Sequence, residues 1–197
     1  MISELLSKRN LPELLVASDG GAIKNTDEWE KHREYLKDLL CREEYGYMPP
    51  SPLSLTFETI EENKRYCASK AIYKKINATV TLPAGSFTFP FYYVYPAGEG
   101  KYRTVIHINF RDCVPDMYMP TEEIIDNGLA IASFCYTDVT SDDGDFTNGL
   151  AAIVYDGSER TDNSCGKIML WAYAAMRVAD YVLAQPQTDA AHLCVAG

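Results

Sequence analysis

The stretch Asp189-Ala190-Ala191-His192-Leu193-Cys194-Val195-Ala196-Gly197 has the pattern of a turn, a short apolar strand and a glycine. Two earlier apolar runs, 104–110 and 129–136, have the same character. Near-continuous apolar runs of this length are typical of strands that are buried on both faces of a parallel sheet. The three runs therefore predict parallel strands, and 192–196, the last of them, is expected to form a raw edge of the sheet.

Helical patterns separate these three runs. A short pattern covers about 121–127, where Gly128 is placed to end it. A long pattern covers about 166–185 and stops at Pro186. Strands that alternate with helices predict an α/β sheet. The apolar residues of the long helix recur at helical spacing and predict one apolar stripe, part of it uncovered, of Ile168, Trp171, Ala172, Ala175, Val178, Ala179 and Val182.

The first hundred residues follow other patterns. Residues 1–25 are expected to be irregular, with turn signals at Pro12 and at 19–21. A helix is expected over about 26–42, where Asn25 or Thr26 can cap its start and prolines stop it. Three stretches then alternate between apolar and polar residues, which predicts antiparallel strands with one wetted face. These stretches are 53–57, 71–80 and 87–95. The predicted fold class is therefore α/β, with antiparallel strands first and parallel strands with helices after them.

Length and charge limit the classes of protein that fit. The 197 residues correspond to one domain at about 150 residues per domain, here 1–197 with 1–52 as a helical and proline-rich lead-in. The net charge of −10 argues against nucleic acid or an anionic membrane as partner. The chain has no apolar run of about 18 residues and no signal-peptide pattern at residues 1–9, so a cytoplasmic location is expected.

The six cysteines lack any C-x-x-C spacing, which argues against zinc ribbons and thioredoxin-like sites. We expect buried, reduced thiols, all six free. Among the histidines, His32 is expected to be solvated, His107 to be a hydrogen-bonded core residue, and His192 to lie on the surface. No two of them have ligand spacing, so no metal and no cofactor are predicted. The acidic residues of 138–145 are expected to form a solvated loop.

Several stretches, in the same order, resemble one enzyme family. They are 42–50 with the pattern E-x-Y-G-x-x-P, Phe89–Pro96, Val105–Arg111, Gly128–Val139 and the helix and turn of 166–189. The set resembles the α/β-hydrolase esterases of the glucuronoyl esterase and acetyl xylan esterase type, from about residue 10 onward. A strand that ends in glycine is on its own typical of any strand before a turn. Within this set, Gly197 resembles the first glycine of the nucleophile elbow G-x-S-x-G.

The resemblance implies a serine esterase that acts on a carbohydrate ester. In such enzymes a serine attacks the ester carbonyl, a histidine takes the proton and an acid orients the histidine. Here all three are expected to lie beyond Gly197, and the sheet is expected to be truncated. The backbone N–H of Phe110 or Arg111 is the candidate oxyanion donor within the chain. Alone, the chain is expected to be inactive.

Three further expectations complete the hypothesis. The strand 192–196 is expected to pair with a C-terminal segment of the same fold or with a second copy, because an uncovered strand edge promotes association. One alternative function is a catalytically inactive remnant of such an esterase. Another is a carbohydrate-binding or interaction module that uses the aromatic strand 87–95.

Overall fold

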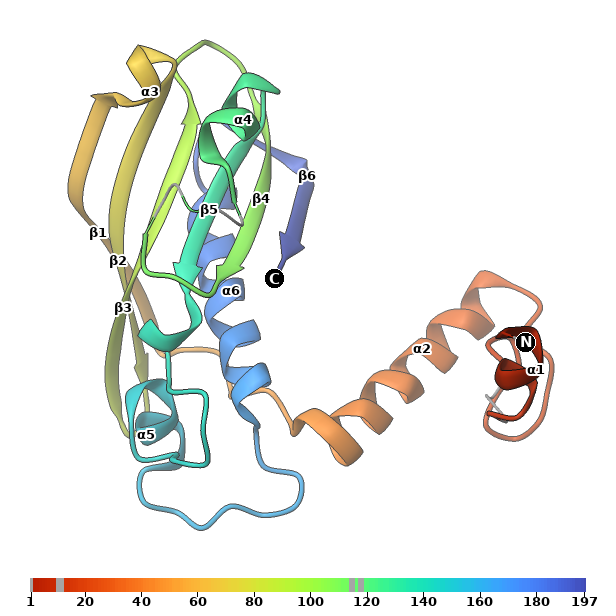
Figure 1. Ribbon diagram of the computed structural model, residues 1–197. Helices are drawn as coiled ribbons and strands as arrows, with labels where there is room; N and C mark the ends of the chain where they lie inside the picture. The colour runs from red at the N-terminus through yellow and green to blue at the C-terminus, as the bar shows by residue number, and fades with distance from the viewer. Residues whose placement is uncertain (1, 10–12, 114–115, 117–118) are drawn as a thin grey trace.

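The computed structural model describes residues 2–9, 13–113, 116 and 119–197. One six-stranded sheet, of order β1-β2-β3-β5-β4-β6, forms the body of the molecule (Figure 1). The strands are β1 (Ser54–Arg65), β2 (Ala71–Leu82), β3 (Gly85–Pro96), β4 (Tyr102–Asn109), β5 (Ala130–Cys135) and β6 (Thr188–Ala196). None of the helices in these ranges has the length and apolarity needed to cross a bilayer.

The first three strands pair antiparallel, as the alternating sequence predicts. On β2 the side chains of Ile76, Ala78 and Val80 are fully buried against the core, whereas those between them lie on the wetted face. On that wetted face the hydroxyls of Thr79 and Thr88 bond across strands at 2.8 Å. A single turn of helix, α3 (Tyr66–Ser69), joins β1 to β2.

The last three strands form the parallel part, as predicted, because β4 pairs in parallel with both β5 and β6. Every residue of β5 is buried. The predicted raw edge at 192–196 is confirmed, since Val195 is 62% exposed and Cys194 is also exposed. The reason is position: β6 forms one edge of the sheet, and no described segment lies on its outer side.

Two layers of helices flank the sheet. Helix α4 (Thr121–Asp126) packs on one face through Ile125, and Gly128 follows it with φ +72°, as expected of a helix-ending glycine. Helices α5 (Gly149–Tyr155) and α6 (Lys167–Leu183) pack on the other face. Helix α5 was not predicted from the sequence.

The buried face of α6 differs from the predicted stripe. Ile168 is 59% exposed and departs from the stripe, whereas Trp171 and Ala179 are half-buried and pack against the core. Helix α6 carries apolar residues around most of its circumference, so the helical period alone does not orient it. The residues of α6 that are buried in the core are Leu170, Tyr173, Ala174, Ala175, Val178, Tyr181 and Val182.

An arm precedes the sheet. It contains α2 (Thr26–Leu40), which continues into one π-helical segment, η1 (Cys41–Tyr45). Asn25 caps α2 as expected, because its Oδ1 accepts the Glu28 N–H at 3.0 Å. Gly46 ends the arm with φ +75°, where a Cβ would lie 2.1 Å from the Ser164 carbonyl oxygen. Only glycine fits this crossing.

The first 25 residues are more regular than the sequence indicates. A short helix, α1 (Ile2–Ser7), lies at the N-terminus, and Val16 and Ala22 form an antiparallel bridge. The turn at 19–21 is present, since Asp19 Oδ1 accepts the Gly21 N–H at 2.9 Å. The predicted turn at Pro12 lies outside the described residues.

Candidate active site

The parallel strands β4, β5 and β6 all end at the same edge of the sheet. The loop after β4 leads to α4 on one face, whereas the loop after β5 leads to α5 and α6 on the other. Loops that leave neighbouring strands toward opposite faces open a crevice at the carboxyl edge, and ligands of α/β proteins bind there. This edge is therefore the candidate active site.

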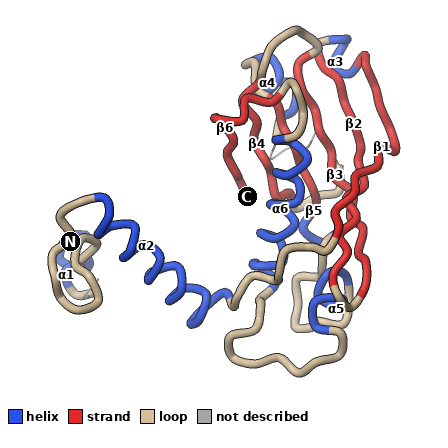
Figure 2. Tube along the Cα trace, turned by 180° about the vertical axis from the view of Figure 1, so that it is seen from behind, coloured by secondary structure: helices blue, strands red, loops and turns tan. Residues whose placement is uncertain are grey.

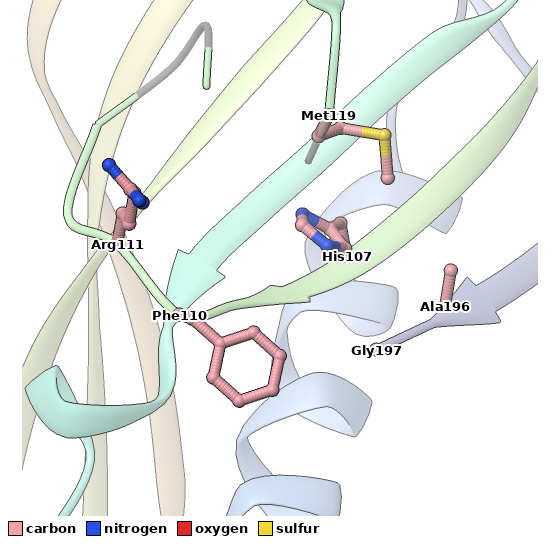
Figure 3. Close-up of a pocket in the computed structure, with 6 residues that line it drawn as sticks. All are labelled: His107, Phe110, Arg111, Met119, Ala196 and Gly197. Carbon is pink, nitrogen blue, oxygen red and sulfur yellow. The ribbon is translucent and has the colours of Figure 1, made fainter. Parts of the chain in front are cut away.

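A cavity of about 710 Å³ opens at this edge (Figure 3). Its lining includes both oxyanion candidates, Phe110 and Arg111, and the expected start of the nucleophile elbow, Gly197. The structure thus brings together all three candidate residues, from segments that are almost ninety positions apart in the sequence. The other lining residues are His107, Met119 and Ala196.

The side chain of Asn109 holds the loop that follows β4. Asn109 is buried, its Oδ1 accepts the Arg111 N–H at 3.3 Å, and its Nδ2 donates to the Cys113 carbonyl at 3.4 Å. The Tyr92 hydroxyl donates to the Asp112 carbonyl at 2.6 Å. The loop is therefore fixed from two strands, and the Arg111 N–H is already engaged within it.

The ring of Phe110 lies at the mouth of the cavity and is 66% exposed. It meets the Tyr136 ring edge-on at 5.5 Å, and Tyr136 in turn meets Trp171 of α6 at 5.1 Å. Aromatic pairs of this geometry contribute about 0.5–1.5 kcal/mol beyond the burial of area. The row of rings ties the loop after β4 to the helix behind the sheet.

Gly197 lies in tight contact with β4. A Cβ built on Gly197 would lie 3.2 Å from Ile108 Cβ and 3.4 Å from the Ile108 carbonyl oxygen. A larger residue would have to displace Ile108. A glycine is what a nucleophile elbow requires at this position, because the turn brings strand and helix close together.

A second hollow, of about 410 Å³, lies between the loops after β4 and β5 and shares Phe110 and Arg111 with the first. Two carboxyl groups, of Asp112 and Asp138, line it with Thr137. Burial, and secondarily the charge of Asp112, raises the pKa of Asp138. The hollow is therefore a polar pocket that adjoins the main cavity.

His107 is buried, as expected, and lies 3.4 Å through its Nδ1 from the Ser133 hydroxyl. Burial lowers its pKa, an effect that the charge of Asp116 partly opposes. Neither His107 nor Met119 was predicted as a site residue, although both line the cavity. His107 lies two positions before Asn109 and therefore on the same face of the strand, and this spacing could have predicted it as a site residue. No comparable pattern marks Met119.

Of the other two histidines, one has the predicted exposure to solvent and one does not. His192 is exposed, as expected, and its Nδ1 lies 2.7 Å from Asp189 Oδ2. The expectation for His32 was wrong, because this side chain is buried between Trp29 and Tyr35, which stacks on it at 5.9 Å. Residues 15–23 fold back onto α2 and cover His32, which a helical pattern alone does not reveal.

Within the described ranges, no three His, Cys, Asp or Glu side chains are arranged to hold a metal ion. The carboxylates of Asp143 and Asp145 instead accept hydrogen bonds inside their own loop, and Lys167 donates into that loop.

All six cysteines are free, but Cys113 and Cys194 are exposed, so the expectation of burial was wrong for these two.

Comparison with known proteins gives relatives by structure only. No protein-family model matches the sequence, and no curated protein matches it either. A glucuronoyl esterase of carbohydrate esterase family 15 from Teredinibacter turnerae matches 96% of this chain with a TM-score of 0.83 at 22% identity. A glucuronoyl esterase from Solibacter usitatus matches 94% with a TM-score of 0.82 at 19% identity.

The match has the same extent in each case. This chain covers 50% of the Teredinibacter turnerae chain and 56% of the Solibacter usitatus chain, so it spans about half the length of these esterases. A third match, at a TM-score of 0.65 and 20% identity, is the glucuronoyl esterase of Sporotrichum thermophile in complex with methyl 4-O-methyl-β-D-glucopyranuronate. The mixed sheet, the helices on both its faces and these matches together show that the chain has the α/β-hydrolase fold of the glucuronoyl esterases, over about half of their length.

Proposed function

We propose that this chain forms one half of a serine esterase that hydrolyses a carbohydrate ester of the glucuronoyl type. The observation that carries the proposal is the shared cavity of Phe110, Arg111 and Gly197 at the carboxyl edge of the parallel strands. In this proposal the nucleophilic serine follows Gly197, and the acid and the histidine of the triad also come from sequence outside these 197 residues.

The proposed role of the chain in the reaction is to support the oxyanion. Attack on an ester carbonyl places negative charge on its oxygen, and a fixed backbone N–H stabilises that charge. Because the Arg111 N–H is engaged with Asn109, the Phe110 N–H is the stronger candidate of the two. An exposed aromatic ring lies at the mouth of the cavity, and the polar pocket lies beside it. This combination suits a substrate that has both apolar faces and hydroxyl groups.

One alternative loses support from burial. The aromatic strand β3 was considered as a carbohydrate-binding surface, but Phe89, Phe91 and Tyr93 are fully buried in the core. A stacking platform for sugars needs exposed rings, whereas the other three rings of the strand, Phe87, Tyr92 and Tyr95, are half-buried and pack against the core. The alternative of an inactive remnant stays open to the experiment below.

The test joins this chain, after Gly197, to the part of the Teredinibacter turnerae esterase that it does not match. The joined protein should hydrolyse methyl 4-O-methyl-glucuronate, whereas the 197-residue chain alone should hydrolyse neither this ester nor p-nitrophenyl acetate above a heat-treated control. Faster hydrolysis of acetylated xylan than of the glucuronate ester would move the substrate to the acetyl class. A folded joined protein that hydrolyses neither ester would support the inactive remnant.

A matched pair of variants tests the oxyanion donor. Phe110→Pro removes the N–H, and Phe110→Ala removes only the ring. Loss of one oxyanion donor costs about 100- to 1000-fold in kcat. We therefore expect that loss for the proline variant of the joined protein and a much smaller one for the alanine variant. Equal effects of the two variants would remove Phe110 N–H from the mechanism.

A further inference from the structure

A buried lysine at the start of α6 carries a charge that the proposed reaction does not use. Lys167 is the first residue of the helix, and only 8% of its side chain is exposed. Burial of an ammonium group is costly unless the charge is paired and hydrogen-bonded. The positive end of the helix dipole adds to that cost, because it disfavours a cation at this position. Contacts from other parts of the chain must therefore offset both costs.

Oxygen atoms from the loop between β5 and α5 surround the ammonium of Lys167. Its Nζ donates to the Thr140 hydroxyl at 3.0 Å, to the Ser141 hydroxyl at 3.1 Å and to the Asp145 carbonyl at 2.5 Å. An ammonium group has three donors, so all three are used. Asp143 Oδ1 lies 3.8 Å from Nζ and supplies the opposite charge. The buried charge is therefore both paired and fully hydrogen-bonded.

The two hydroxyl groups in this loop are oriented to accept from a cation. The Ser141 hydroxyl donates its own proton to Asp143 Oδ1 at 2.6 Å, and the Thr140 hydroxyl donates to Asn148 Oδ1 at 3.2 Å. Each hydroxyl oxygen thus keeps its lone pairs for Nζ. Hydroxyl, carbonyl and carboxylate oxygens are the ligands that hard cations prefer. We name residues 140–148 the cation loop, because the ammonium takes the place of a bound cation in it.

The cation loop is connected to the candidate active site through Tyr136. The Thr140 N–H donates to the Tyr136 carbonyl at 3.3 Å, so the residue that binds the ammonium also closes the turn that carries this tyrosine. The Tyr136 ring contacts Phe110 on one side and Trp171 on the other. Trp171 lies four positions after Lys167, on the same side of α6. Figure 2 shows the beginning of α6 and α5 at the same end of the body.

We propose that Lys167 is a positioning residue. Its ammonium is the resident cation of the cation loop and, through Thr140 and Tyr136, it holds Phe110 at the candidate active site. The effect on the reaction rests on the proposed function, whereas the role as resident cation does not. A cation that is covalently attached occupies its site whatever ions the solution contains, so the loop keeps one conformation.

The first experiment replaces the attached cation by a free one in the 197-residue chain. Lys167→Ala should speed amide exchange at Thr140 and Arg111 by about 10-fold, because both N–H groups are bonded within the two loops. n-Propylammonium matches the part of the side chain that is lost and should restore slow exchange by binding to the folded state. Tetramethylammonium has the same charge but no N–H donor and should not. The matched control is Lys31→Ala, at an exposed lysine of α2, which should change neither amide.

The outcomes of this experiment decide the role of the ammonium. Exchange at Thr140 that stays slow in Lys167→Ala, or that n-propylammonium does not slow again, would overturn the inference. Exchange that changes at Thr140 but not at Arg111 would overturn the connection to Phe110. If Lys167→Ala is unfolded, recovery of the folded chain in n-propylammonium, and not in tetramethylammonium, replaces the exchange measurement. Equal recovery in both salts, or none, would then overturn the inference.

The second experiment measures the effect on the reaction in the joined protein. Because Lys167 acts on the oxyanion donor and not on the substrate, Lys167→Ala should lower kcat for methyl 4-O-methyl-glucuronate by about 10-fold with KM unchanged. n-Propylammonium should restore kcat. A rise in KM with kcat unchanged would remove Lys167 from the positioning of Phe110. A joined protein that is inactive with Lys167 in place would refute the proposed function only, since the amide exchange tests the resident cation separately.

Discussion

At the scale of single residues, Asn109 combines two roles that the site depends on. It ends β4 in the buried core and satisfies both an N–H and a carbonyl of the loop after it. Removal of this amide loses two hydrogen bonds to the loop, and each contributes about 0.5–1.5 kcal/mol net.

We therefore expect Asn109→Ala to lower the free energy of unfolding of the chain by about 1–3 kcal/mol and to speed amide exchange at Arg111. The matched control is Asn63→Ala, which removes an exposed side-chain bond to the Arg65 N–H and should cost less than about 0.5 kcal/mol. Urea unfolding of both variants measures the difference. Equal stability of the two would show that the loop does not depend on Asn109.

His107 makes the stability of the chain depend on pH. Burial lowers its pKa below that of the unfolded chain, so the unfolded state binds the proton more readily. The full stability is present above the unfolded pKa, about 6.5, and declines as the pH falls through that value toward the lower folded pKa.

The free energy of unfolding should consequently fall more between pH 7.5 and 5.5 for the native chain than for His107→Gln. Carboxyl groups titrate equally in both proteins, so the difference between the two slopes isolates the imidazole. Parallel slopes would mean that His107 keeps an ordinary pKa in the folded chain.

At the scale of elements, the orientation of α6 decides which side chains carry its packing energy. Leu170 is fully buried against the sheet, whereas Ile168, two positions earlier, is mostly exposed. Truncation of a buried leucine removes apolar contact and leaves a cavity, whereas truncation of an exposed isoleucine changes little.

Leu170→Ala should cost about 2–5 kcal/mol of unfolding free energy in the 197-residue chain, and Ile168→Ala less than about 1 kcal/mol. Thermal or urea unfolding of the two variants gives the comparison. A larger loss of unfolding free energy for Ile168→Ala than for Leu170→Ala would show that α6 packs through the stripe that the sequence predicts.

At the scale of the whole molecule, the reactivity of the six thiols measures which parts of the chain are buried and which are exposed. Burial raises the pKa of the Cys165 thiol to about 12, so its reactive thiolate is scarce at neutral pH. Cys113 lies on the loop after β4 and Cys194 on the open strand β6, and both are exposed.

Six thiols should titrate after denaturation without reductant, since all six are free. In the native chain Cys113 and Cys194 should react first, and Cys135 and Cys165 only on unfolding. Fewer than six groups in the denatured titration would indicate a disulfide. In the joined protein, slower reaction of Cys194 alone, with Cys113 as the internal control, would agree with a covered β6.

The sequence alone determined the class of the fold and most of its elements, because local patterns carry that information. Alternation over 71–80 fixes the wetted face of β2, and the unbroken apolar run of 130–135 predicts a strand that is buried on both sides. Gly128 and Asn25 mark helix ends through local backbone chemistry. The collinear motifs pointed to the esterase fold that the structural matches share.

Only the tertiary structure decided where those elements face and what meets at the edge. Whether 192–196 is buried depends on what lies beyond β6, and the rotation of α6 depends on which of its several apolar sides meets the sheet. His32 is buried because residues 15–23 fold back onto α2. Phe110 and Gly197 line one cavity because β4 and β6 are neighbours, which no local pattern states. Contacts between distant segments depend on the path of the whole chain, and a periodicity within one segment does not contain that path.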